Sequence, residues 1–151
     1  MYKATIFLLI LLLSLLSAKP VATQEEQLAE EQVEVEAAKL TVETKLGTGI
    51  EERELIGEAS TFPPSVGRVY CWTCVTGADE PTEITHVWYY GVEKMAEVAL
   101  PVEYPRHRTW SHKTILPEWK GQWRVEILDA AGNKLDSTVF ETTEMTEETT
   151  E

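Results

Sequence analysis

The chain has 151 residues, of which 43% are hydrophobic, and its formal net charge is −13. This length and composition suit one globular domain with some chain left over. The charge lies mainly in the flanks: residues 19–61 carry −7 and residues 141–151 carry −5, whereas residues 62–140 carry −2. Phosphate binding needs clustered Lys and Arg, so this composition argues against nucleic acid as a partner.

The first five residues contain one Lys, and residues 6–17 that follow are almost wholly apolar. Twelve helical residues rise about 18 Å, which is short of the roughly 30 Å hydrocarbon core of a bilayer. We therefore expect residues 1–18 to be a secretory signal peptide that is cleaved after Ala18. Leu16 is large for its position before the cleavage site, so retention as an N-terminal membrane anchor is the alternative. Either interpretation predicts export to the periplasm or cell envelope, with no other contact with a membrane.

Two acidic segments flank the expected domain at residues 39–141. Residues 19–38 hold six Glu and no aromatic residue, and they are expected to be a solvated tether. Residues 142–151 are Thr- and Glu-rich, and they cannot bury enough surface to offset the entropy of ordering. We expect this tail to be disordered.

Between the flanks, apolar and polar residues alternate with the period of a β-strand. The first strand is expected at residues 40–46, and the Gly- and Pro-containing segment 47–64 is expected to be mostly loop. Residues 68–75 and 82–90 are apolar on both faces, which predicts central strands. Four further strands are expected at residues 95–102, 106–115, 122–128 and 134–140.

About seven short strands with frequent turns and no helical period predict an all-β fold. We expect an immunoglobulin-like β-sandwich of about seven antiparallel strands, with a small barrel as the alternative. The expected core residues are Val69, Cys71, Trp72, Ile84, Trp88, Val98, Leu100, Trp123, Val125 and Ile127.

Four motifs at residues 40–140 resemble, in order and spacing, the bacterial domain of unknown function numbered 2914. They are the pair Trp72-Thr73, the strand with His86 and Trp88, the segment Arg106–Lys113, and the Gly-x-Trp-x-Val strand that leads to Asp-x-x-Gly at residues 121–132. A Trp is usual in that family at the position of His107. The resemblance implies a β-rich module on exported or membrane-anchored bacterial proteins, and it implies no known activity.

The spacing of Cys71 and Cys74 matches C-x-x-C, but the pair lies inside a predicted strand. Three strand residues separate two Cα atoms by about 10 Å, whereas a disulfide needs less than about 7 Å. Odd spacing also points the side chains to opposite faces. We expect two separate buried thiols and no disulfide; a bulge that allows a disulfide, or redox activity, are the alternatives.

Catalytic and metal signals are weak. The two Cys and three His provide a single paired spacing, so we expect no metal and no cofactor. Ser111 and His112 are sequence neighbours and would point to opposite faces of a strand, which argues against a catalytic triad. We therefore expect no enzyme and name no catalytic residue.

The segment Arg106–Lys113 is the most informative, because neither of its faces is apolar enough to be simple core. One interpretation is an edge strand protected from aggregation by its charges, with Trp110 packed inward. The other is a shallow site for an anionic group or a sugar, with Arg108 lying over an aromatic ring. The tentative ligand-binding residues are Arg106, Arg108, Trp110 and Lys113.

These observations favour a non-catalytic interaction module of the bacterial cell envelope that binds a protein or a glycan. The alternative is a structural or accessory domain without a discrete ligand, and an unrecognised enzyme or redox protein is a third hypothesis. A pocket that brings Arg106, Arg108 and Trp110 together would favour the binding module. A flat surface with fully paired charges would favour the structural role.

Overall fold

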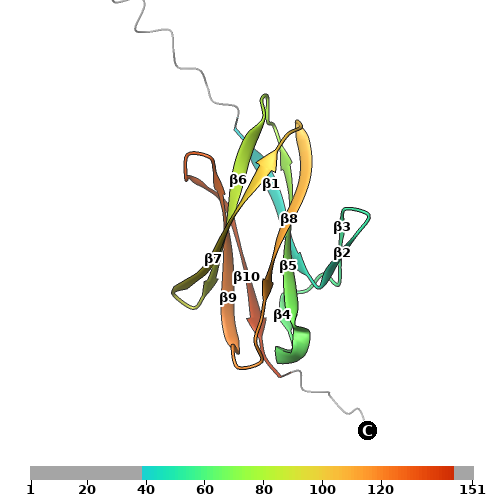
Figure 1. Ribbon diagram of the computed structural model, residues 1–151, viewed down its shortest axis with the longest axis vertical. Helices are drawn as coiled ribbons and strands as arrows, with labels where there is room; N and C mark the ends of the chain where they lie inside the picture. Colours follow the sequence, from blue (N-terminus) through green and yellow to red (C-terminus); the bar gives the residue numbers. More distant parts are fainter. Residues whose placement is uncertain (1–38, 145–151) are drawn as a thin grey trace, which may run out of the picture. The chain divides into compact units, whose positions relative to one another are not determined.

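The computed structural model describes residues 39–144 (Figure 1). The predicted signal segment, the tether and all but the first residues of the acidic tail lie outside this range. Within residues 39–144, no helix is long and apolar enough to cross a membrane.

The described residues form two facing β-sheets and one small hairpin (Figure 1). Neighbouring strands are antiparallel except for β4, which is parallel to β10. The smaller sheet has the order β1 (Thr41–Gly47), β5 (Arg68–Thr76), β8 (Arg106–Thr114). The larger sheet has the order β4 (Thr61–Phe62), β10 (Lys134–Thr142), β9 (Gly121–Asp129), β6 (Thr82–Tyr90), β7 (Glu93–Val102). The hairpin consists of β2 (Gly49–Glu51) and β3 (Glu54–Ile56), and a short 3-10 helix, η1, spans Pro64–Val66.

The strand order is that of an immunoglobulin-like sandwich. When the seven long strands are lettered A, B, C, C′, E, F and G along the chain, the sheets read A-B-E and G-F-C-C′. The two sheets approach each other at both edges, where β1 lies beside β10 and β7 beside β8. The predicted all-β sandwich is therefore confirmed, and β5 and β6, which are apolar on both faces, are inner strands of their sheets as predicted.

The segment expected to be mostly loop is more ordered than predicted. It contains the β2–β3 hairpin, β4 and η1, and the hairpin lies outside the smaller sheet, on the side away from the larger one (Figure 1). Ile50 and Leu55 face each other across the hairpin. Gly47 permits the close return of the chain, because a Cβ there would lie 2.5 Å from the carbonyl oxygen of Ile56.

The apolar core lies between the two sheets and is rich in aromatic rings. Trp123 is fully buried and stacks on Phe140, with 5.7 Å between ring centroids and 8° between ring planes. Eight of the ten expected core residues are buried, but Val98 and Leu100 are only half-buried because β7 is an edge strand. Trp72 is buried on the outer face of its sheet rather than in this core, because it alternates with the inward-facing Cys71 and Thr73.

A chain of buried hydrogen bonds crosses the core from one sheet to the other. Thr73 Oγ1 of β5 lies 3.0 Å from His86 Nε2 of β6, and His86 Nδ1 lies 2.8 Å from Ser111 Oγ of β8. Trp88 Nε1 donates to the same Ser111 Oγ at 3.0 Å. His86 and Thr73 are fully buried and Ser111 nearly so, which makes each of these bonds costly to break.

The donors and acceptors of this polar chain suit a neutral imidazole. Ser111 accepts a hydrogen bond from Trp88, so its own hydroxyl proton is available for His86 Nδ1. When Nδ1 accepts from Ser111, Nε2 donates a hydrogen bond to Thr73 Oγ1; in the other tautomer, Nδ1 donates to Ser111 and Nε2 accepts from Thr73. This arrangement satisfies a neutral imidazole, and burial lowers the pKa of His86 to about 4.

The Trp123→Ala substitution tests the core. Removal of a fully buried indole should lower the free energy of unfolding by about 3–5 kcal/mol, because the cavity loses both transfer energy and packing. Urea denaturation measures this loss. A decrease under about 1 kcal/mol would mean that Trp123 does not occupy the core, since surface substitutions typically fall within ±0.5 kcal/mol.

The Ser111→Ala substitution tests the polar chain. It leaves Trp88 Nε1 and His86 Nδ1 without their buried partner, which should cost about 1–3 kcal/mol of stability. Ser137→Ala is the matched control, because Ser137 lies exposed on β10. Equal unfolding free energies for the two variants would contradict a stabilising role for the network.

The pKa of His86 predicts a stability change with pH. The unfolded chain binds a proton at this imidazole near pH 6.5 and the folded chain near pH 4, so the contribution is full above pH 6.5 and is lost as the pH falls toward 4. Between pH 7 and pH 5 the free energy of unfolding should decrease by about 2 kcal/mol. A His107→Gln/His112→Gln variant should show the same decrease. Loss of the decrease in that variant, or a titration of His86 near 6.5 in folded protein by NMR, would contradict the assignment.

Candidate functional site

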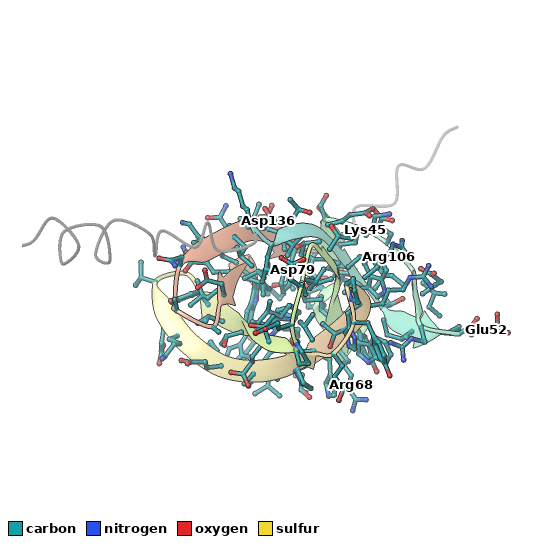
Figure 2. The ribbon with its side chains drawn as sticks, turned by 90° about the horizontal axis from the view of Figure 1, so that it is seen from above. Lys45, Glu52, Arg68, Asp79, Arg106 and Asp136 are labelled. Atoms are coloured by element: carbon teal, nitrogen blue, oxygen red, sulfur yellow. The ribbon has the colours of Figure 1, made fainter. Side chains whose placement is uncertain are left out.

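A cleft lies where the tip of the β2–β3 hairpin meets the beginning of β8. It consists of one hollow of about 480 Å³ and an adjoining one of about 200 Å³, which share four lining residues. Figure 2 shows the labelled Glu52 at the hairpin tip and Arg106 on the same side of the sandwich. We call this feature the arginine cleft; its lining residues are Arg53, Glu103, Tyr104, Arg106, His107, Arg108, Thr109 and Trp110.

Arg53 is held in the cleft by its backbone and its side chain. Glu52 and Arg53 form the two-residue turn of the hairpin with φ values of 48° and 68°, a left-handed conformation that side chains other than Gly adopt at a cost. Trp72 Nε1 donates to the Arg53 carbonyl at 2.9 Å, and Arg53 Nη2 donates to the Arg108 carbonyl at 2.9 Å. Such strain persists where surrounding contacts impose it, and it is frequent at ligand sites.

The guanidinium of Arg53 also lies over the Trp110 ring, 5.7 Å from its centroid. This cation–π contact covers an outward-facing indole that lies opposite Trp72 in the neighbouring strand. We expected Arg108 to lie over an aromatic ring. Instead, Arg108 Nη1 pairs with Glu54 Oε1 at 2.6 Å, which joins the hairpin to β8 a second time.

A stacked pair of rings forms another wall of the cleft. Tyr104 and His107 lie with 5.7 Å between centroids and 12° between ring planes. Tyr104 is 62% exposed, which leaves part of its ring open to solvent. Arg106 lies between these two residues in the chain; it is exposed and lines the smaller hollow.

The cleft is positively charged although the chain is acidic. Three guanidiniums line it and Glu103 is its single lining carboxylate. Glu54 neutralises Arg108, whereas Arg53 and Arg106 form no ion pair within residues 39–144. Arg108 Nε is also buried without a hydrogen-bond partner among these residues. The arrangement can therefore accept an anionic group through forked N–H donors.

The structure brings together three of the four predicted ligand-binding residues. Arg106, Arg108 and Trp110 line the arginine cleft. Lys113 does not, since it lies farther along β8 with its Nζ 5.4 Å from the Trp119 ring centroid. The interpretation that Trp110 packs inward is wrong, because its neighbours Thr109 and Ser111 are buried and an alternating strand then turns Trp110 outward.

Sequence reasoning missed Arg53 and Tyr104. Arg53 lies in a segment expected to be loop, and no Asn-Gly or Asp-Gly pair marks its turn. The sequence gives only a weak signal for a hairpin here. Ile50 and Leu55 lie at equal distances on either side of the turn residues, and Gly49 and Gly57 lie outside this apolar pair. Tyr104 precedes Pro105 in a short connection, and its exposure gives no periodic signal.

Buried nucleophiles lie away from the cleft. The contact of 2.8 Å between His86 and Ser111 has the spacing of a nucleophile and its base, but Thr73 stands where a carboxylate would orient the imidazole. Cys71 and Cys74 are both free and buried, and desolvation raises the pKa of Cys71 to about 12. A protonated buried thiol is a poor nucleophile. Within residues 39–144, no group of three or more His, Cys, Asp or Glu could hold a metal ion.

Part of the chain matches a known protein family. Residues 81–142 match the model of a family described as "Protein of unknown function (DUF2914)". No curated protein matches the chain. The matched segment runs from β6 to the end of β10, so it contains His86, Ser111 and most of the cleft, whereas Thr73 and Arg53 precede it.

The family that the sequence motifs indicated is thus confirmed over the second part of the sandwich. The resemblance was expected over residues 40–140, and the match begins later, at residue 81. Residues 81–142 of this chain are therefore similar to the family of proteins of unknown function DUF2914.

Proposed function

We propose that this domain is a non-catalytic binding module outside the cytoplasm, and that the arginine cleft is its ligand site. The partner is a protein or glycan of the bacterial envelope that presents an anionic group. The apolar residues 6–17, followed by Ala18, support export. The family description supplies no activity, so the proposal rests on the site.

One observation carries the proposal: two guanidiniums from separate elements, Arg53 and Arg106, converge on one cleft without forming an ion pair in the described chain. Gathering like charges on a folded surface costs energy unless a partner compensates it. A total volume of several hundred Å³ is also within the usual range of ligand sites.

A structural role is the second candidate, and a different observation favours it. Arg53 and Arg108 both hold the hairpin against β8, through the Arg108 carbonyl and through Glu54. If this were their whole purpose, substitution would loosen the hairpin and affect no partner. Arg106 distinguishes the two roles, since it makes neither of these contacts.

An Arg53→Ala/Arg106→Ala variant should lose binding to detergent-washed bacterial envelopes. Arg106→Ala alone should weaken this binding while its melting temperature stays close to that of the original chain, because Arg106 makes neither hairpin contact. A charge-assisted hydrogen bond contributes about 1.5–3 kcal/mol, so the affinity should decrease by about tenfold or more. Co-sedimentation of the full chain in a non-ionic detergent measures the bound fraction.

The matched control is Arg68→Ala/Lys134→Ala, which removes the same charge from exposed positions outside the cleft. It should bind like the original chain. Equal binding by all of these proteins, or no binding by any of them, would remove the support for a binding site and favour the structural role.

A further inference from the structure

The side chains of the arginine cleft also indicate the chemical class of its ligand. We propose that it binds an acidic sugar, a pyranose ring that carries a carboxylate, as one unit of an envelope polysaccharide. This inference rests on the proposed function and makes it more specific. It follows from the charge of the cleft, its exposed aromatic ring and the contacts already made at the strand edge.

The charged wall matches a carboxylate. Arg106 is exposed and Arg53 uses one N–H on the Arg108 carbonyl, so both retain donors that can point into the cleft. A guanidinium can bind a carboxylate through two parallel N–H bonds, which gives orientation as well as energy. The nearby Glu103 lies among the lining residues and provides an acceptor for a sugar hydroxyl.

The ring wall matches one face of a sugar. The C–H groups on a pyranose face carry partial positive charge, and the face of an aromatic ring is negative. Tyr104 is 62% exposed, and the nearly parallel His107 ring supports it from one side. A ring held in this way loses little side-chain entropy when a ligand stacks on it.

An acidic peptide fits this place less well. Peptides commonly gain affinity at a sheet edge by adding a strand through main-chain hydrogen bonds. At this edge, Arg53 already occupies the carbonyl of Arg108, and β7 lies beside β8. These contacts favour recognition by side chains, which suits a ring with a charged substituent.

Three probes separate ring from charge in a calorimetric titration of the full chain in non-ionic detergent. Oligogalacturonate has both rings and carboxylates, its full methyl ester has the rings alone, and poly-L-glutamate has the carboxylates alone. We expect binding of oligogalacturonate, with at least about tenfold weaker binding of the other two, because each lacks one of the two contacts.

Two matched variants report on the ring contact. Tyr104→Phe keeps the aromatic face and should bind oligogalacturonate like the original chain, whereas Tyr104→Ala should bind at least about tenfold more weakly. Tyr104 is mostly exposed, so both variants should fold.

The outcomes distinguish this inference from the broader proposal. Equal binding of poly-L-glutamate and oligogalacturonate, unaffected by Tyr104→Ala, would overturn the sugar assignment and leave an anion-binding cleft. Failure of all three probes, with envelope binding still dependent on Arg53 and Arg106, would overturn the sugar assignment alone. Failure of the probes together with unchanged envelope binding by the cleft variant would overturn both proposals.

Discussion

The interior of this sandwich depends on one neutral imidazole. His86 links Ser111 and Thr73 of the smaller sheet to β6 of the larger sheet, and burial favours its uncharged form. An immunoglobulin-like core is otherwise apolar, so these polar atoms must meet their partners at one relative position of the sheets. Sliding one sheet over the other would leave several buried donors and acceptors unpaired, which purely apolar packing would tolerate far better.

This constraint also determines what lies on the outside. Because Thr73 and Ser111 face His86, their neighbours Trp72 and Trp110 must face away from the core. These two indoles stand opposite each other in the β5–β8 ladder. One bonds the Arg53 carbonyl and the other lies under its guanidinium, so the same strands that close the core also position the arginine cleft.

The features that the sequence predicts are local, whereas those that it does not predict depend on contacts between distant segments. Alternating residues predicted the long strands, and apolar residues on both faces identified β5 and β6 as inner strands. Contacts between distant segments had no such signal. Ser111 forms its hydrogen bond with His86, 25 residues earlier, and not with its sequence neighbour His112. Only part of the cleft could be predicted. Arg106, Arg108 and Trp110 lie on one strand, and their alternation places them on one face. Arg53 reaches them only through a hairpin, and its turn residues are unusual in a left-handed backbone conformation.

The β2–β3 hairpin forms one wall of the arginine cleft and lies outside the two sheets. The β8 side of the cleft belongs to the segment that matches the family, while Arg53 comes from an excursion between β1 and β4. Mutations that lengthen or shorten this hairpin, or change its charge, would reshape the arginine cleft. Their main cost would be the loss of the contacts that the hairpin makes with Trp72 and Trp110. The fold is thus maintained by the strands of the two sheets, whereas one wall of the cleft comes from a hairpin outside them, much as antibody domains carry their binding loops on a framework of strands.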